Sequence, residues 1–506
     1  MAGHSRRFKE KGYELPKFLL KLGSQTVIEK VINMFSYEDN FHLILNKKLD
    51  NLDEVIDYLQ QLSPNIHIYL INSHEKGPAY SVLSTDLNIL DSEPILISYC
   101  DFTIDWDYKR FKREAEGCDA GVPFFRGFHA SSLGDTKYAY MKIESNRMLE
   151  LKEKESFTSY PMSEPASCGI YYFKSLSYFH ELASELFQSK IALPNGEAYV
   201  SLLLNLSVRR GDFVFSFKVN KFICLGTPED YEQYLFWEKI FVSTPNQIHR
   251  EKIIDYSLIP MAGEGSRFKE SGFRASKPFI QIGEELLFEK CVRSLPASKN
   301  YIYILREHNS ISKLIQARIS LLNNESHIDV IHIKNKTEGQ VNTCLMAENY
   351  YSEKGSLLIS SCDYELRFNQ SLLTNELNSD SDVLIFTCKL GSLPVASYDS
   401  FAYCQVDKHK NVLSIVEKEC ISNTPQNDHM VTGTFWFRKA SYFTNAAKDL
   451  LSRKHKINNE YYVGTSINSL ISEGLKVRIF EVDQWASFGN PTELDLYLYW
   501  QDYFNQ

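Results

Sequence analysis

The sequence lacks any long apolar run. No hydrophobic stretch approaches eighteen residues, so no membrane-spanning helix is predicted. The first seven residues contain no apolar segment typical of a signal peptide. None of the ten cysteines has C-x-x-C spacing, which argues against a zinc site or a disulfide framework. We therefore expect a cytoplasmic protein with reduced thiols.

An excess of positive charge is also missing. The 506 residues carry a formal net charge of −9, which argues against a surface that coats nucleic acid. Hydrophobic residues make up 43% and charged residues 24% of the chain, as in ordinary globular proteins. The length predicts two to four domains.

The most informative stretch, residues 258–277, fits neither common phosphate-binding fingerprint. It has no third glycine for G-x-G-x-x-G and no G-K-[ST] after four spacers. Residues 253–259 are mostly apolar and predict a buried strand. Gly263 and Gly265 allow a tight turn that a ligand can approach closely, and a helix carrying Phe268 is expected to follow.

The chemistry of this stretch suits a triphosphate. Free backbone N–H groups at a turn into a helix can bind phosphate oxygens. Arg267 adds a planar guanidinium fork and Lys277 a compact positive charge. The stretch therefore predicts a nucleoside triphosphate cradle; the alternative is a strand, turn and helix with solvated cations.

The pattern of a strand, G-x-G-[ST]-R-[FLM] and a later Lys-Pro resembles the sugar-phosphate nucleotidyltransferases, the family of glucose-1-phosphate thymidylyltransferase. Here it reads Gly263-Glu-Gly-Ser-Arg267-Phe, followed by Lys277-Pro278. The resemblance implies transfer of a nucleotidyl group from an NTP to a sugar 1-phosphate or similar phosphorylated metabolite, with release of pyrophosphate. It also implies Mg²⁺ as the cofactor and a role in supplying surface polysaccharide precursors.

The same pattern occurs a second time, at the start of the chain. Residues 1–10 match residues 261–270 at an offset of 260 and pair Arg7 with Arg267 and Lys17 with Lys277. Further pairs follow along the chain: Gly77 with Gly339, Asp101 with Asp363, Glu153 with Glu417, and Gly169 with Gly433. A period this long indicates a whole domain rather than a solenoid unit.

We therefore predict two tandem nucleotidyltransferase-like domains, at residues 1–241 and 253–506, joined by a linker at 242–252. In both, apolar runs alternate with helical segments, which predicts Rossmann-like α/β domains with mixed, mostly parallel sheets, as in the GT-A fold. The apolar runs are residues 41–45, 66–71, 94–98, 302–305, 330–333 and 356–359. Ligands are expected beyond the carboxyl ends of the strands.

One difference separates the copies. The second has a strand at residues 253–260, and the first starts at Met1, the counterpart of Met261. Either residues are missing upstream or the first copy is impaired. Ser5 also replaces Gly265, so the second copy is expected to be the more competent catalyst, and the copies are expected to prefer different substrates.

Metal binding is assigned to Asp363 and Asp101, each in a small-residue context after an expected strand. Mg²⁺ prefers one or two carboxylates together with ligand phosphates; the alternative is that each aspartate caps a helix. At the position of the family's second metal aspartate stand Cys224 and Ser487, and the nearby Asp483 is the candidate substitute in the second copy.

The remaining roles follow from the resemblance, position by position. The catalytic cations are Arg267, Lys277, Arg7 and Lys17. The nucleotide is expected at Ala262, Gly263, Gly265, Gly339, Ala2, Gly3 and Gly77. The acceptor is expected at Glu417, Lys418, Gly433, Glu153, Lys154 and Gly169.

Three other functions are kept open. The first is a cytidylyltransferase for a non-sugar phosphate, of the phosphocholine or phosphoamino-acid type. The second is that one copy is silent and serves as a binding or scaffold domain. The third, a GT-A glycosyltransferase, is disfavoured because residues 103 and 365 do not complete a D-x-D motif. Expected partners are an NTP and a phosphorylated small molecule; homo-oligomerisation is left open.

Overall fold

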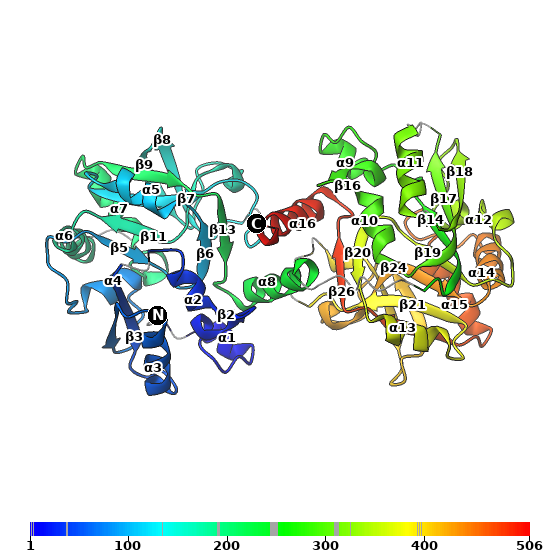
Figure 1. The fold of residues 1–506 in the computed structure, drawn as a ribbon, viewed down its shortest axis with the longest axis horizontal. Coiled ribbons are helices and arrows are strands. Elements are labelled where there is room, and N and C mark those ends of the chain that lie inside the picture. Colours follow the sequence, from blue (N-terminus) through cyan, green and yellow to red (C-terminus); the bar gives the residue numbers. More distant parts are fainter. Residues whose placement is uncertain are drawn as a thin grey trace. The chain divides into compact units, whose positions relative to one another are not determined.

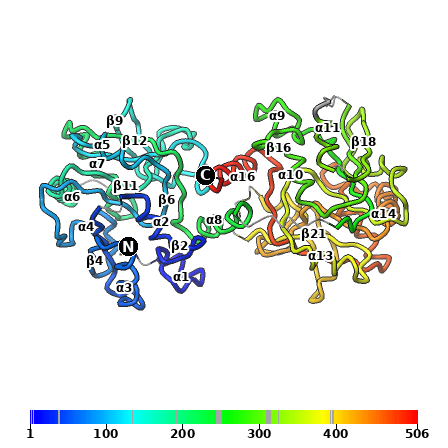
Figure 2. Tube along the Cα trace, viewed as in Figure 1, coloured from blue at the N-terminus to red at the C-terminus, as the bar shows by residue number. Residues whose placement is uncertain are grey.

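The chain forms two compact units, Met1–Leu235 and Phe236–Gln506 (Figures 1 and 2). In the computed structural model the described residues are 1, 3, 5–36, 39–133, 135–189, 193–242, 251–307, 313–323, 325–391, 393, 395 and 397–505. Of the predicted linker, residues 243–250 lie outside the described part. No helix within the described part is long and apolar enough to cross a membrane.

The second unit is built on a mixed sheet. Its strands are β14 (Ile254–Pro260), β17 (Ser298–Arg306), β18 (His327–Ile333), β19 (Leu357–Ser360), β21 (Val383–Cys388), β22 (Ala402–Val406), β23 (Val412–Glu417), β24 (His429–Phe437) and β25 (Val477–Glu481). Their order is β18-β17-β14-β19-β24-β21-β25, with β22 and β23 joined at β24. β14 runs parallel to both neighbours, whereas β24 is antiparallel to β19 and β21.

Helices cover both faces of this sheet. They are α9 (Ser266–Glu270), α10 (Leu287–Ser294), α11 (Lys313–Leu322), α12 (Gln340–Leu345), α13 (Gln370–Leu377), α14 (Ala440–Ser452), α15 (Val463–Ser472) and α16 (Pro491–Phe504). Leu258 of β14 lies in an apolar cluster with α12, α14 and α15. The next residue, Ile259, lies in a second cluster with α10, α11 and α13. Successive side chains of β14 thus enter opposite cores, as in a strand that is buried on both faces.

The first unit has a similar sheet, but its last strand is β5, and two further strands form a separate sheet. Its strands are β5 (Ile95–Ser98), β7 (Ala120–Phe125), β8 (Ala139–Glu144), β9 (Arg147–Glu153), β10 (Ala166–Ser167), β11 (Ile170–Phe173) and β12 (Val214–Lys218), in the order β10-β8-β9-β12-β7-β11-β5. A separate parallel pair is formed by β3 (Phe41–Asn46) and β4 (Ile66–Ile71).

Two apolar clusters flank the sheet of the first unit as well. One includes residues of α4, α6 and α7, and the other residues of α5. The helices are α1 (Arg6–Glu10), α2 (Val27–Ile32), α3 (Leu52–Leu62), α4 (Pro78–Leu83), α5 (Tyr108–Ala115), α6 (Leu176–Gln188), α7 (Ser201–Arg209) and α8 (Pro228–Phe241). The last of these, α8, crosses from the first unit into the second.

Each unit also carries short antiparallel pairs at its edge. In the first these are β1 (Lys21–Leu22) with β2 (Gln25–Thr26) and β6 (Phe102–Asp105) with β13 (Lys221–Cys224). In the second they are β15 (Gln281–Ile282) with β16 (Glu285–Leu286) and β20 (Tyr364–Arg367) with β26 (Gln484–Ser487).

All six predicted apolar runs lie on strands, namely β3, β4, β5, β17, β18 and β19. The strand before Met261 and the helix that carries Phe268 are also present, as β14 and α9. The sheets are less parallel than predicted, because β24 and β11 run antiparallel to their neighbours. Apolar runs show where strands are but not in which direction each one pairs.

The backbone of Ser5, in the turn before α1, has a strained conformation. Ser5 has φ 47° and Gly265, its counterpart, has φ 59°. A side chain in this left-handed region costs about 1–2 kcal/mol, so Ser5→Gly should stabilise the chain by about 1 kcal/mol in denaturant unfolding. The reverse change, Gly265→Ser, should destabilise it by a similar amount. A destabilising Ser5→Gly would contradict this reading of the turn.

Candidate active site

The turn that follows β14 leaves its backbone open. A side chain at Gly263 would meet no protein atom within 4 Å, and the same holds for Gly3. Gly265, by contrast, is packed, because a Cβ there would come within 3.1 Å of the Cβ of Lys277. Ala262 is buried beneath the turn, and its counterpart Ala2 lies outside the described residues. Gly263 therefore leaves room for something other than protein.

Lys277 reaches the predicted metal ligand of the second unit. It lies on a 3₁₀ turn, Lys277–Phe279, and its Nζ is 2.5 Å from Asp363 Oδ2 and 2.9 Å from the carbonyl oxygen of Gly489. Asp363 lies between β19 and β20. A strand follows it rather than a helix, so the alternative in which Asp363 caps a helix is wrong.

The first unit repeats this pair. Lys17 Nζ is 2.6 Å from Asp101 Oδ2, and Asp101 lies between β5 and β6, so it caps no helix either. Burial alone would lower the pKa of the Lys17 ammonium, but the Asp101 carboxylate raises it above its usual value. A cavity of about 1050 Å³ in this unit is lined by Gly3, Lys17, Gly77 and Asp101 among others.

The two predicted arginines are exposed on short helices, Arg267 on α9 and Arg7 on α1. Burial lowers the pKa of the Lys418 ammonium, the Glu417 carboxylate opposes this shift, and the Arg267 guanidinium adds to it. Such an influence requires that Arg267 and Lys418 be near one another. The predicted catalytic arginine and the predicted acceptor lysine of the second unit therefore lie in one region.

Glu417 ends β23, and Lys418 follows it with φ 59°. Burial raises the pKa of the Glu417 carboxyl to about 7. A Cβ at Gly464 would lie 2.5 Å from Glu417 Oε1, so glycine at this position lets the carboxylate approach α15. The Lys418 ammonium donates a hydrogen bond to the carbonyl of Ser400.

In the first unit the same carboxylate has a hydroxyl partner. The Ser201 hydroxyl, in the place of Gly464, donates to Glu153 Oε2 at 2.5 Å. Burial raises the pKa of Glu153, and this hydrogen bond opposes the shift. Lys154, at φ 57°, donates to the Tyr199 hydroxyl at 2.7 Å. The two units thus hold the same pair of residues in different electrostatic settings.

The glycines near the predicted base are fixed by packing. Gly339 has φ 136°, and a Cβ there would lie 2.4 Å from the backbone nitrogen of Tyr461. Gly77 has φ 89° and meets the backbone of Ala198 at 2.6 Å in the same way. Both begin a helix, α12 or α4. A structural reason for glycine therefore exists at both positions, and their contact with a nucleotide stays a prediction.

The glycines near the predicted acceptor lie close to the segments that carry the predicted metal ligands. A Cβ at Gly433 would approach Ser361 Oγ at 3.1 Å, and one at Gly169 would approach the ring of Tyr99 at 3.1 Å. Gln340 Nε2 is 3.5 Å from the same Ser361 hydroxyl. Ser361, which was not predicted, therefore joins residues of three segments next to Asp363.

The sequence also gave no sign of a second acidic residue near Asp363. A Cβ at Gly489 would lie 3.1 Å from Asp363 Oδ2 and 3.2 Å from Glu493 Oε2, so both carboxylates flank this glycine. Glu493 Oε2 accepts hydrogen bonds from Ser487 Oγ and the Gly489 N–H. Asp230 is its counterpart in the first unit and accepts from the Thr227 N–H and from Cys224 Sγ.

Asp483 is not the substitute. The pairing of β20 with β26 places Ser487 opposite Tyr364, next to Asp363, and Gln484 opposite Arg367. Asp483 precedes Gln484, and its N–H donates to the carbonyl of Arg367. It therefore lies at the far end of the four-residue strand β26. Because a strand rises roughly 3.3 Å per residue, the length of β26 separates Asp483 from the predicted metal ligand Asp363.

The carboxylates of Asp363 and Glu493 fit Mg²⁺. Oxygen ligands suit this ion, which usually takes one or two carboxylates and completes its shell with water and substrate phosphates. Among the described residues, no group of three or more His, Cys, Asp or Glu side chains is placed to hold a metal. The two carboxylates that flank Gly489 would thus supply part of a shell.

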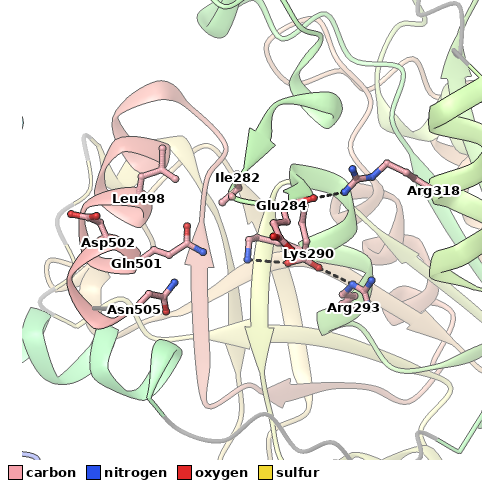
Figure 3. Close-up of a pocket in the computed structure, with 11 residues that line it drawn as sticks. Ile282, Glu284, Lys290, Arg293, Arg318, Leu498, Gln501, Asp502 and Asn505 are labelled. Atoms are coloured by element: carbon pink, nitrogen blue, oxygen red, sulfur yellow. Dashed lines mark hydrogen bonds and ion pairs between the residues drawn. The ribbon is translucent and has the colours of Figure 1, made fainter.

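The second unit has a hollow of about 930 Å³ lined by charged side chains (Figure 3). Its charged side chains are paired: Lys290 and Arg293 contact Glu285 at 3.1 and 2.8 Å, and Arg318 contacts Glu289 at 2.6 Å. The residues that line it include none of the predicted site residues within the described part of the chain. It is therefore not the predicted phosphate cradle, which lies at Gly263, Arg267 and Lys277.

Residues 2–238 match the family model described as Nucleotidyl transferase. This matched segment includes Lys17, Asp101, Glu153 and Lys154. No curated protein matches the chain.

Several solved structures are similar to half of the chain. A nucleoside-diphosphate-sugar pyrophosphorylase from Vibrio cholerae is 21% identical, covers 48% of this chain and 99% of its own, and has a TM-score of 0.40. An inositol-1-phosphate CTP transferase from T. maritima is 13% identical, with coverages of 49% and 96% and a TM-score of 0.39. A putative glucose-1-phosphate thymidylyltransferase from Bacillus anthracis is 12% identical, with coverages of 49% and 94% and a TM-score of 0.38.

The Glu417 carboxyl provides a pH test. Because burial raises its pKa to about 7, it is mostly neutral below pH 7 and mostly charged above. Acceptor hydroxyls donate more strongly to a carboxylate, so the KM for the acceptor should fall as pH rises through 7. Glu417→Gln should remove this step, as measured by KM against pH.

A second variant is Gly464→Ser, which copies Ser201 and requires the end of the Glu417 side chain to move away from the new Cβ. A hydroxyl donor favours the charged carboxylate, so the step in KM should move to lower pH. An unchanged profile in Glu417→Gln would assign the step to another group, such as the acceptor phosphate.

Proposed function

We propose that this protein transfers a nucleotidyl group from an NTP to a sugar 1-phosphate or similar phosphorylated metabolite and releases pyrophosphate. The observation that carries the proposal is the pairing of a cradle lysine with a carboxylate after a strand, Lys277 with Asp363 and Lys17 with Asp101. The match of residues 2–238 to the Nucleotidyl transferase family supports it.

The reaction has a simple balance. An oxygen of the acceptor phosphate forms a bond to the α-phosphorus of the NTP, and the bond from that phosphorus to the bridging oxygen breaks. The electron pair leaves with pyrophosphate. Lys277 and Arg267 would stabilise the charge that develops on the phosphate oxygens, and Glu417 and Lys418 would orient the acceptor.

Mg²⁺ would be held by Asp363 together with Glu493. When bound, it neutralises part of the triphosphate charge. The Lys277 ammonium contacts Asp363 Oδ2 at 2.5 Å, so the lysine and the ion would share this carboxylate.

We further propose that the chain holds two such units in tandem, each with its own site. The shared strand order, the two Lys–Asp pairs and the positive φ of Lys154 and Lys418 support this. The predicted acceptor carboxylates have different neighbours, because Ser201 donates a hydrogen bond to Glu153 whereas Gly464 has no side chain to offer Glu417. This difference supports different substrates for the two units. The sugar and the role in polysaccharide supply rest on the resemblance alone.

The lysine pair gives the first test. Lys277→Ala removes a preorganised donor, which should lower pyrophosphate release with the second unit's substrates by about 10²–10³-fold. The assay would screen each NTP with Mg²⁺ against a panel of sugar, alcohol and amino-acid phosphates. Lys269→Ala, an exposed lysine two residues after Arg267, is the control and should keep full activity.

Lys17→Ala should leave the second unit's reaction within about twofold, since groups that share no partner act nearly independently. Loss of that reaction would contradict two separate sites. Choline or inositol phosphates as the preferred acceptors would overturn the assignment to sugars.

The carboxylate pair gives the second test. Asp363→Asn should lower turnover by about a hundredfold or more, and Glu493→Gln should raise the Mg²⁺ concentration needed for half-maximal rate by about 10–100-fold. Both would be read from rates titrated with Mg²⁺. Asp483→Asn is the control and should behave like the wild type. Unchanged Mg²⁺ dependence in Glu493→Gln would limit this residue to capping the start of α16.

A further inference from the structure

In the first unit a short segment, residues 197–201, lies against the loop that is predicted to bind the nucleotide. The N–H of Ala198 donates to the carbonyl oxygen of Lys76 at 2.9 Å, and the N–H of Ala79 donates to that of Ala198 at 3.0 Å. A Cβ at Gly77, between these two bonds, would lie 2.6 Å from the backbone nitrogen of Ala198. Glycine therefore lets the two backbones meet, and the segment is fixed to the nucleotide loop.

The second unit repeats this contact with residues 460–464. The N–H of Tyr461 donates to the carbonyl oxygen of Glu338 at 3.0 Å, and the N–H of Val341 donates to that of Tyr461 at 3.2 Å. Both segments continue into a helix, α7 or α15. We call them the connecting segments, because each joins the nucleotide loop to the predicted acceptor pair.

The connecting segment of the first unit holds both acceptor residues by its side chains. Lys154 Nζ donates to the Tyr199 hydroxyl at 2.7 Å and lies 4.7 Å from the centre of its ring. The Tyr199 hydroxyl donates in turn to Glu197, so a lone pair of its oxygen is left for the lysine. Two residues further on, the Ser201 hydroxyl donates to Glu153 Oε2 at 2.5 Å.

The acceptor lysine of the second unit is held by a different part of the chain. The Lys418 ammonium donates to the carbonyl oxygen of Ser400, at the end of the 3₁₀ turn of residues 398–400. Its Nζ lies 5.7 Å from the centre of the Tyr462 ring, and the Tyr462 hydroxyl is hydrogen-bonded to Glu460. The ring contact is thus common to both units, whereas the hydrogen bond from lysine to tyrosine belongs to the first.

Both ends of Lys154 are fixed before any ligand binds. Its backbone has φ 57°, a left-handed conformation that persists only where the surroundings impose it. Its N–H donates to the carbonyl oxygen of Tyr138 at 2.9 Å, and its ammonium is held by Tyr199. A long side chain that is already ordered loses less rotamer freedom when it meets a phosphate. The Tyr199 hydroxyl therefore preorganises the acceptor lysine.

We propose that Tyr199 is a positioning residue that couples nucleotide and acceptor binding in the first unit. The nucleotide loop holds the connecting segment by its backbone, and the segment holds the Lys154 ammonium where the acceptor phosphate arrives. A nucleotide that orders the loop then tightens acceptor binding, and the acceptor tightens nucleotide binding by the same factor. In the second unit the coupling does not pass through the Tyr462 hydroxyl, because Lys418 is hydrogen-bonded to Ser400.

The identity of the two ligands rests on the proposed function, whereas the contact between Tyr199 and Lys154 can be tested without it. The full chain is acylated briefly, and the rate at each lysine is read by peptide mass spectrometry. Tyr199→Phe keeps the ring and removes the hydroxyl, so Lys154 should react about threefold faster or more once its ammonium is released from this hydrogen bond.

Tyr462→Phe is the matched control for the acylation. It should leave the rate at Lys418 within about twofold, because a phenylalanine ring preserves the cation–π contact. An unchanged rate at Lys154 in Tyr199→Phe, or equal changes at the two lysines in their respective variants, would overturn the proposal.

The coupling is measured by calorimetry in chains that carry Lys418→Ala, which removes the second unit's acceptor lysine. Glucose 1-phosphate and inorganic phosphate are titrated with and without the α,β-methylene analogue of each NTP and Mg²⁺, because such analogues cannot release pyrophosphate. The nucleotide should tighten acceptor binding about fivefold or more, and Tyr199→Phe should remove most of this factor.

A factor that stays the same in Tyr199→Phe would overturn the coupling. If no analogue and no phosphate binds, the proposed function fails and the coupling fails with it. The acylation rates would still decide whether Tyr199 positions Lys154, so the two failures can be told apart.

Discussion

A central parallel strand must be paired along both edges and covered on both faces. Each buried backbone N–H or C=O group without a hydrogen-bond partner lowers the stability of the fold by about 1–3 kcal/mol. This requirement therefore determines where the strand lies and where the turn after it begins. In the second unit β14 meets the requirement through β17 and β19. The turn that holds Gly263 and Gly265 is anchored to it. The pairing of β14 with β19 also brings this turn close to Asp363, which follows β19.

The two units keep the same charge arrangement and vary what surrounds it. Lysine and aspartate are paired at 2.5 Å in one and 2.6 Å in the other. Glu493 and Asp230 differ by one methylene, and Gly464 and Ser201 leave the acceptor carboxylate with different partners. Changes of this size alter affinity and protonation without altering the fold. They are the kind of difference that lets two related sites accept different ligands.

The sequence was a good guide to local structure. The apolar runs lie on strands, and the glycine-rich turn lies between β14 and α9, because burial and backbone freedom act over a few residues. It was a poorer guide to what long-range pairing brings together. Glu493 was missed and Asp483 was chosen in error, because only the register of β20 with β26 shows which end of β26 lies next to Asp363. Ser361 was missed because the residues it meets, Gln340 and Gly433, are distant from it in the sequence. The role of Ser201 was missed for the same reason, since Glu153 lies 48 residues away in the chain.

The most direct test of the account is the identity of the product. The full chain would be incubated with an NTP labelled at the α-phosphorus, Mg²⁺ and a sugar 1-phosphate, and the products would be separated and weighed by mass spectrometry. The account predicts one molecule of pyrophosphate for each labelled nucleotide joined to the acceptor phosphate. Release of orthophosphate, or label that stays with free nucleotide across the whole panel of NTPs and acceptors, would contradict it.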